Sequence, residues 1–257
     1  MTLDDLGHDV DVPRVAGRVV SLVPSITEGL AAARPDALVG ATEWCTHPVD
    51  LDVTRVRGTK NPDRAAIEQL RPDLVVANQE ENRELDVRRL REAGVPVWVT
   101  RIETVDEALG SLRRLFDDAL WWGAPDWLDA ASSAWEAPAP AARGTVVVPI
   151  WRDPWMVVGP QTFTADLLRR LGWTVSAGRE ALRQAQGAGR PERYPHVELA
   201  DVDTAEVDLV LLPDEPYVFG PDDGPEAFTS APTRLVSGRL LTWYGPSLVE
   251  ARTALDL

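Results

Sequence analysis

The residue types that most suggest a chemical function in this sequence are aromatic side chains placed in predicted loops. The chain of 257 residues contains ten tryptophans. Several of these lie at predicted loops rather than in strand interiors, together with two tyrosines: Trp44, Trp151, Trp155, Trp243, Tyr217 and Tyr244. Large rings with a polar edge are suited to stacking against a flat, partly apolar ligand. The alternative, that a ring fills a hydrophobic core, stays open for each of them.

A second group of side chains with chemical potential lies in the predicted loop 42–48. Cys45 and His47 are two residues apart, so both could face one ligand as axial ligands of a chelated metal. The alternative is a packed thiol and a surface histidine. One cysteine and one histidine cannot close a tetrahedral site, so we expect neither a resident metal nor an intrinsic cofactor.

Polar side chains also follow two predicted strands. Asn78, Glu80 and Glu81 follow the first of these strands, and the pair Asp214-Glu215 follows the second. Paired carboxylates can perform acid–base catalysis, although such pairs are usually solvated. The phosphate-binding patterns GxGxxG and GxxxxGK[ST], the nucleophile pattern GxSxG and the zinc pattern HExxH are all absent from the sequence. We therefore expect a binding protein and not an enzyme.

Composition narrows the possible partners. Twenty-six basic and 41 acidic residues give a net charge of −15, which repels nucleic acid and anionic membrane surfaces. No apolar run approaches the roughly 20 residues that cross a bilayer, so we expect no membrane insertion. The N-terminus lacks the pattern of a secretory signal. We expect a cytoplasmic monomer as the sequence stands, and an extracytoplasmic one if a signal or lipoprotein segment was removed.

The elements that must position these side chains alternate between strands and helices. Strands are predicted near 18–22, 37–41, 74–77, 95–99, 145–151, 155–158, 173–175, 208–212 and 235–236, and helices near 26–33, 64–70, 84–93, 164–171 and 247–255. One amphipathic helix is expected over 104–121, a short hairpin over 4–13, and a loop over 178–194. This alternation indicates an α/β fold with mainly parallel sheets flanked by helices.

The restart of the α/β pattern after the Pro- and Ala-rich segment 137–142 predicts two lobes. We place the N-terminal lobe at 1–103, the linker helix and its connection at 104–142, and the C-terminal lobe at 143–257. The expectation is a ligand cleft between the lobes, at the carboxyl ends of the strands.

Several segments resemble one known family. Five segments are similar to the cobalamin- and iron-siderophore-binding proteins of ABC importers, members of the helical-backbone metal receptor superfamily: RVVSLVPSITE at 18–28, IEQLRPDLVVA at 67–77, WRDPWMVVG at 151–159, DLVLLPDEPY at 208–217 and LTWYG at 241–245. The resemblance covers nearly the whole chain, and the cobalamin-binding branch is the most similar.

The resemblance implies a chelated-metal ligand such as a corrinoid, haem or a ferric siderophore. It places the ligand-contacting loops at 44–47, 78–82, 151–155 (which includes Arg152), 217 and 243–244. It also implies an ABC permease as partner, docked through an acidic residue on each lobe. In the first lobe that acid is expected near Ala65, with Asp63 or Glu68 as substitutes.

Two alternatives stay open at this stage. A cytoplasmic cofactor-handling protein or enzyme on the same scaffold would use Cys45, His47, Glu80 and Glu81. That hypothesis requires an exposed Cys45 with a lowered thiol pKa. A partner-binding module would instead accept a protein segment against its aromatic side chains.

Overall fold

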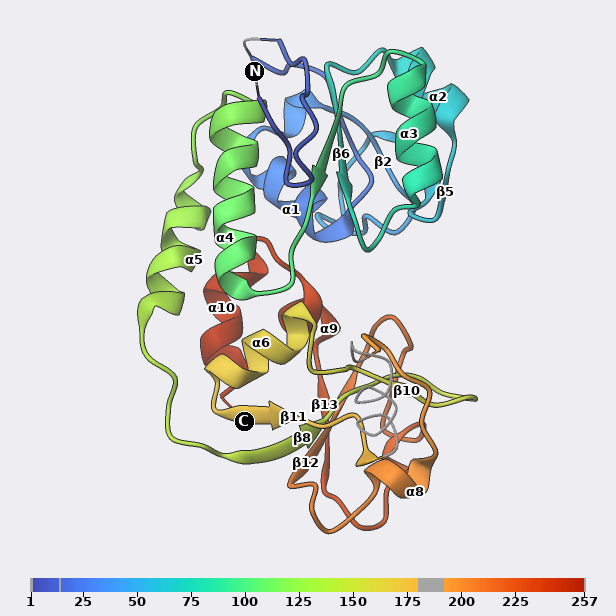
Figure 1. Ribbon diagram of the computed structural model, residues 1–257, viewed down its shortest axis with the longest axis vertical. Coiled ribbons are helices and arrows are strands. Elements are labelled where there is room, and N and C mark those ends of the chain that lie inside the picture. Colours follow the sequence, from blue (N-terminus) through green and yellow to red (C-terminus); the bar gives the residue numbers. More distant parts are fainter. Residues whose placement is uncertain (1, 14, 180–191, 257) are drawn as a thin grey trace. The chain divides into compact units, whose positions relative to one another are not determined.

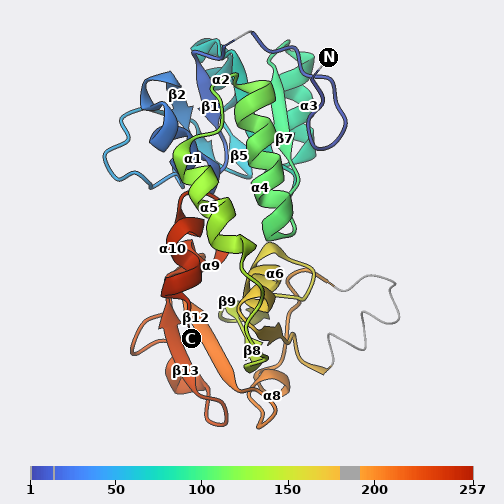
Figure 2. The ribbon, with the colours of Figure 1, turned by 90° about the vertical axis from the view of Figure 1, so that its left-hand side faces the viewer.

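The computed structural model describes residues 2–13, 15–179 and 192–256 (Figures 1 and 2). These residues form two compact units: Met1–Ile102, Asp106–Ala134 and Tyr244–Val249 make up the first, and Glu103–Val105, Trp135–Trp243 and Glu250–Leu257 the second. The lobe boundaries expected at 103 and 143 stay a prediction. In the two compact units, most of the segment 104–142 belongs to the first. Most of the loop expected over 178–194 lies outside the described residues.

The first unit is built on a five-stranded parallel sheet. The strands lie in the order β3-β2-β1-β6-β7, and the helices packed with them connect consecutive strands. The elements are β1 (Val19–Ser21), α1 (Pro24–Ala33), η1 (Pro35–Ala37), β2 (Leu38–Ala41), β3 (Thr54–Arg55), β4 (Arg57–Gly58), β5 (Asn61–Pro62), α2 (Arg64–Leu70), β6 (Leu74–Asn78), α3 (Glu84–Glu92) and β7 (Val97–Thr100).

Burial explains why the predicted strands of this sheet were easy to locate. β1, β6 and β7 are buried along their whole length, as expected for strands covered on both faces by helices. Ile67 of α2 and Leu90 of α3 pack against Val75 in the core on one of these faces. Figure 1 shows α2 and α3 on one side of the sheet and α1 on the other. The predicted parallel α/β architecture is confirmed.

The second unit contains a four-stranded parallel sheet with the order β11-β8-β12-β13. A short antiparallel pair, β9 with β10, extends from it. The elements are β8 (Gly144–Val147), β9 (Pro149–Trp151), β10 (Met156–Val157), α6 (Phe163–Arg170), β11 (Trp173–Val175), α8 (Leu199–Val202), β12 (Leu209–Pro213), η3 (Pro225–Ala227), β13 (Thr233–Val236), α9 (Gly238–Thr242) and α10 (Ser247–Ala254).

The helical region expected over 104–121 is present but is not one uniform α-helix. It consists of α4 (Val105–Arg114) followed by η2 (Leu115–Ala119), a π-helical turn that ends before Trp121 at a φ of 57°. A further helix, α5 (Asp126–Glu136), was not expected. The sequence pattern missed it because apolar residues lie all along this short segment.

The helices α1 and α2 begin in different ways. Asp63 caps α2, since its carboxylate accepts a hydrogen bond from the Ala66 amide at 3.1 Å. No side chain caps α1, which begins two residues before the expected position 26, at Pro24. Proline has no amide donor to satisfy at the first helical position.

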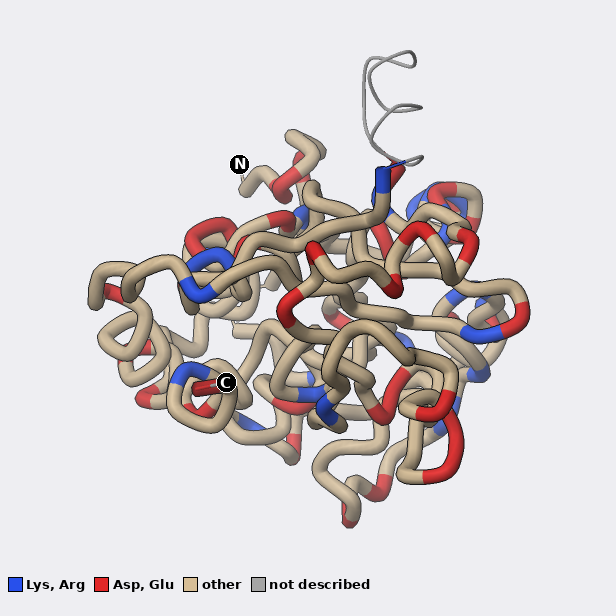
Figure 3. Tube along the Cα trace, turned by 90° about the horizontal axis from the view of Figure 1, so that it is seen from below, with Lys and Arg blue, Asp and Glu red and all other residues tan. Residues whose placement is uncertain are grey.

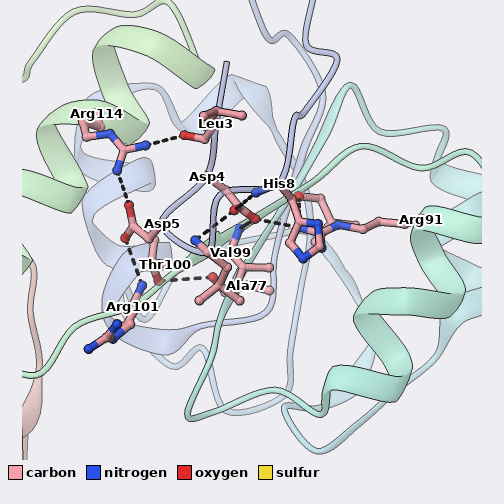
Figure 4. Close-up of polar contacts among 12 residues, drawn as sticks. Leu3, Asp4, Asp5, His8, Ala77, Arg91, Val99, Thr100, Arg101 and Arg114 are labelled. Atoms are coloured by element: carbon pink, nitrogen blue, oxygen red, sulfur yellow. Dashed lines mark hydrogen bonds and ion pairs between the residues drawn. The ribbon is translucent and has the colours of Figure 1, made fainter. Parts of the chain in front are cut away.

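The N-terminal segment is fixed to the first unit by two aspartates (Figure 4). The Asp4 carboxylate accepts hydrogen bonds from the amides of Leu6 and His8 at 2.9 Å and from Arg91 at 2.6 Å, and its side chain is fully buried. Asp5 pairs with Arg114 at 2.7 Å. The expected hairpin at 4–13 is therefore a single bridge between Leu3 and Asp9, supported by side chains rather than by strand pairing.

Replacing Asp4 tests this attachment. Asp4→Asn is expected to lower the free energy of unfolding by about 2–4 kcal/mol, because the Arg91 guanidinium and three amides, those of Leu6, His8 and Val99, lose their charged acceptor. Urea unfolding followed by circular dichroism measures the change. The control Glu92→Gln removes an exposed ion pair with Arg88 and should shift stability by at most about 0.5 kcal/mol. Equal midpoints for the two variants would contradict the assignment.

Candidate ligand-binding site

In the second unit, the predicted ligand residues gather where the strand order reverses. β8 lies between β11 and β12. The chain runs from β8 toward β11 and from β12 toward β13, so the connections from the carboxyl ends of these two neighbouring strands diverge. Crevices outside such reversal points are the usual ligand positions in parallel sheets. Trp151 follows β8 through β9, and Tyr217 follows β12. Parallel pairing of β8 with β12 therefore brings these two rings to the same edge.

Trp151 and Tyr217 form what we call the aromatic pair. Their ring centroids lie 5.7 Å apart at an interplanar angle of 77°, an edge-to-face contact. Trp151 is 45% exposed, and the neighbouring Val218 is 72% exposed. A large ring that is held by its edge and open on a face can stack against a planar molecule.

Arg152 holds this region together through carboxylates. Its Nη1 atom donates to Asp223 and, at 2.5 Å, to Glu226. The Tyr217 hydroxyl donates to the second oxygen of Asp223 at 2.7 Å. We call Arg152, Tyr217, Asp223 and Glu226 the Arg152 network. Arg152 therefore lies in the predicted loop but binds the protein itself, which fixes the orientation of Tyr217.

The network shifts the acid–base behaviour of its members. The hydrogen bond that Tyr217 donates to Asp223 raises the pKa of the phenol, because ionising it would place two negative charges side by side. The same bond, with Arg152, lowers the pKa of Asp223, and Arg152 lowers that of Glu226. Asp223 and Glu226 are therefore charged at neutral pH, while Tyr217 keeps its proton.

Trp155 supports the pair from below the surface. It stacks on Phe219 at 6.0 Å with an interplanar angle of 3°, and its edge meets Phe228 at 5.5 Å. Arg152 lies 5.5 Å above the Trp155 ring. Trp155 was predicted as a ligand contact, and the structure gives it a half-buried packing position beneath the network. Asp223, Glu226 and Phe219 were missed, because a turn such as Pro221–Gly224 carries no pattern that ties it to a distant tryptophan.

In the first unit, Trp44 is the exposed aromatic residue of the predicted set. It is 65% exposed and its indole nitrogen lies against Gly58, where a Cβ atom would approach it to 3.2 Å. The Arg55 guanidinium binds the carbonyls of Thr42, Cys45 and Leu51 at 2.9–3.1 Å and so fixes the loop. His47 is half-buried in the same loop, with Nδ1 3.2 Å from the Thr46 hydroxyl.

Cys45 points inward from this loop. Its sulfur is fully buried, with the hydroxyl oxygens of Thr27 and Thr42 at 3.0 and 3.1 Å. Burial raises the thiol pKa and outweighs these two contacts, which lower it. This is the opposite of the exposed, low-pKa thiol that the enzyme hypothesis requires. Among the described residues, no group of three or more potential metal-ligating His, Cys, Asp or Glu side chains occurs.

The loop after β6 is organised by hydrogen bonds to Asn78. Its side-chain oxygen accepts from the amides of Glu80 and Glu81 at 2.8 and 3.3 Å. Glu81 in turn accepts from the Tyr244 hydroxyl at 3.0 Å. Asn78 is buried and the two glutamates are half-buried, so the predicted residues of this loop lie together.

Tyr244 and Trp243 lie in the interior, which differs from the expectation that they line a ligand surface. Each is only 7% exposed. Burial and the nearby Glu81 raise the pKa of Tyr244 well above its usual value. Trp243 hydrogen-bonds Glu215, whose carboxyl pKa is raised first by burial and then by Asp214. Both rings thus have polar partners within the protein, as buried Trp and Tyr usually do.

A pocket of about 410 Å³ lies elsewhere in the second unit, at the start of α6. Its charged lining residues are paired: Asp166 with Arg169 and Arg170, and Glu103 with Arg193. None of the predicted ligand residues lines it. We therefore base the candidate site on the aromatic pair.

The fold defines the class of protein to which the chain is similar, that of periplasmic binding proteins. The periplasmic vitamin B12-binding protein of Vibrio cholerae superposes with a TM-score of 0.70 at 18% identity, covering 94% of this chain and 95% of that one. A periplasmic haem-binding protein from Pseudomonas aeruginosa gives 0.70 at 20% identity, covering 94% and 92%. At such identities the likeness shows the fold.

Curated relatives match part of the sequence. A vitamin B12-binding protein of Vibrio cholerae is 30% identical over 105 residues, which cover 40% of this chain and 38% of that protein. An uncharacterized ABC transporter substrate-binding lipoprotein of Bacillus subtilis is 32% identical over 101 residues, or 38% and 32% of the two chains. The matched region thus spans under two fifths of each relative. No protein-family model matches the sequence. The resemblance stated from the sequence is confirmed by these names and by the fold.

None of the helices among the described residues combines the length and hydropathy that a membrane crossing needs.

The buried thiol provides a test of the first-unit loop. Cys45 should react with a thiol reagent such as dithionitrobenzoate at least about tenfold more slowly in the native protein than in urea, because it is covered and protonated. Absorbance at 412 nm follows the reaction. Fast native labelling would contradict the buried position and reopen the enzyme hypothesis.

The Arg152 network makes a prediction about pH. Spectrophotometric titration at 295 nm should show Tyr217 ionising above its ordinary range, and Asp223→Asn should move that ionisation to lower pH by removing the adjacent charge. The difference from Tyr217→Phe isolates its contribution among the three tyrosines. An unchanged titration in Asp223→Asn would show that the hydrogen bond is absent in solution.

Proposed function

We propose that this chain is a non-enzymatic substrate-binding protein of the ABC-importer type, with a corrinoid or another metal chelate such as haem or a ferric siderophore as its ligand. The observation that carries the proposal is the aromatic pair, an exposed tryptophan in edge-to-face contact with a tyrosine at the strand-order reversal of the second sheet. The planar face of such a chelate is the complement of an open indole face.

The internal pairing of charges supports binding rather than catalysis. Tyr217, Arg152 and Asp223 bind one another, and Cys45 is buried with a raised thiol pKa. A nucleophile or general acid needs access to its substrate and a pKa matched to its task. The alternative of a cofactor-handling enzyme that uses Cys45, His47 and the two glutamates has no supporting observation.

The names of the relatives support the corrinoid as the first ligand to test. Of the four similar proteins described above, two are named for vitamin B12 and one for haem. Trp44, exposed on its loop in the first unit, stays a predicted ligand contact. In this proposal the protein acts outside the cytoplasm and delivers its ligand to an ABC permease, as the lipoprotein relative's name supports.

Tryptophan fluorescence titration tests the proposal. Cyanocobalamin, cobinamide, haemin and a ferric siderophore are titrated separately, with N-acetyltryptophanamide as the inner-filter control. We expect saturable quenching by a corrinoid at about micromolar concentration or below, in line with a binding free energy near −8 kcal/mol. Absence of saturable quenching by all four ligands would refute the proposed function.

Substitutions of the aromatic pair locate the binding surface. Trp151→Ala and Tyr217→Ala are each expected to weaken corrinoid binding by about 1–3 kcal/mol, the usual value of a lost stacking contact. Isothermal titration calorimetry measures the affinities. Trp121→Ala is the matched control, because Trp121 is 52% exposed but lies outside all of the predicted ligand-contacting loops. Equal affinities for all three variants would place the ligand elsewhere.

A further inference from the structure

The aromatic pair is bordered by carboxylates. Asp153 follows Arg152 directly, and its side chain is 89% exposed. Asp222 and Asp223 lie in the turn that closes between Gly220 and Asp223, and Glu226 follows it. These four carboxylates belong to the same two loops as Trp151 and Tyr217. We call them the acidic rim, because they border the surface on which a ligand of the Trp151 indole would lie.

The only cation among the residues of these two loops, the Arg152 guanidinium, is already paired. Arg152 is the one basic side chain of segments 151–155 and 217–228. Its guanidinium is paired with the partly exposed Asp223 and Glu226, and its Nε atom lies 3.9 Å from a carboxylate oxygen of Asp153. Four carboxylates (Asp153, Asp222, Asp223 and Glu226) against one guanidinium leave three negative charges uncompensated. More red than blue lies along the trace in Figure 3, in line with the net charge of −15 of the chain.

Metal chelates of similar shape differ in the charge of their rims. Haem carries two propionates and catecholate siderophores are polyanions, whereas the corrin ring of cobinamide carries uncharged amides around a cationic cobalt centre. An exposed negative rim repels the first group over a distance of about 10 Å at 0.1 M salt and does not repel the last. The excess negative charge of the rim therefore acts on selectivity, while the aromatic pair supplies contact area.

We infer that the aromatic pair and its acidic rim select flat metal chelates whose own rim is neutral or cationic, and discriminate against polycarboxylate chelates. This inference rests on the proposed function, since it names the ligand class of the same surface. It places cobinamide-like corrinoids ahead of haem and of catecholate siderophores.

A matched pair of corrinoids provides the test. Cobinamide and cobyrinic acid share the corrin ring, but cobyrinic acid carries free carboxylates where cobinamide has amides. At 50 mM salt we expect cobinamide to bind the full chain at least about tenfold more tightly, and this ratio should shrink at 500 mM salt. Calorimetry gives both dissociation constants without dependence on fluorescence.

Removing rim charges should reduce the discrimination. In Asp153→Asn with Asp222→Asn the ratio is expected to fall by about threefold or more, because two exposed charges that face the ligand are lost. Asparagine tolerates the φ of 56° at position 153, so the loop keeps its conformation. The control, Asp36→Asn with Asp117→Asn, removes the same net charge from exposed positions of the first unit and should leave the ratio unchanged.

The outcomes separate this inference from the function on which it rests. Equal binding of the two corrinoids, tighter binding of cobyrinic acid, or a ratio that falls equally in both double variants would overturn the selectivity and leave a chelate-binding protein. Failure of cobinamide, cobyrinic acid and haemin alike to bind would overturn both. A ratio that falls only in the rim variant is the result that the inference requires.

Discussion

The parallel pairing of β8 with β12 is the constraint on which the candidate site depends. Val146 and Val147 of β8 lie opposite Leu209 and Val210 of β12, and both strands end at the same edge of the sheet. The chain must then leave this edge through two separate loops, one carrying Trp151 and the other Tyr217. Their contact across 66 positions in sequence follows from strand register and from the reversal of strand order, which together create a gap between diverging connections.

The loops that carry these rings lack regular secondary structure, so side-chain interactions must fix their conformation. In the second unit one guanidinium binds two carboxylates, and one of these binds the Tyr217 hydroxyl. In the first unit Arg55 binds three carbonyls of the loop that presents Trp44. Arginine suits both tasks because its planar fork offers several donors at fixed angles. Each unit thus holds an open tryptophan on a loop that an arginine fixes, and this preorganisation lowers the entropic cost of binding.

The sheet strands and most of the helices could be predicted from the sequence because their signals are local. Runs such as Leu74–Asn78 are buried on both faces and read as continuous apolar segments. The π-helical turn at Leu115–Ala119 and helix α5 were missed, since periodicity does not distinguish a local change of helix type or a short helix of mixed composition.

The candidate site was predicted less completely. Trp151, Tyr217 and Trp44 were identified from ring type and loop position. The two tryptophans are exposed, and Tyr217 is half-buried. The same reasoning gave Trp243 and Tyr244, which are buried, because position beside a predicted strand or helix does not reveal whether a ring points outward. The partners of Arg152 lie more than 70 residues away in sequence, and no local sequence pattern indicates which residues they are.

The most direct test of the account is the indole N–H spectrum of ¹⁵N-tryptophan-labelled protein during titration with diamagnetic cyanocobalamin. Trp151→Phe assigns the resonance of Trp151. The account predicts that this resonance shifts or broadens as the ligand saturates the protein, because the corrin ring lies against it, while that of the fully buried Trp98 does not. Saturable binding that leaves the Trp151 resonance unchanged would contradict the central claim that the aromatic pair is the ligand surface.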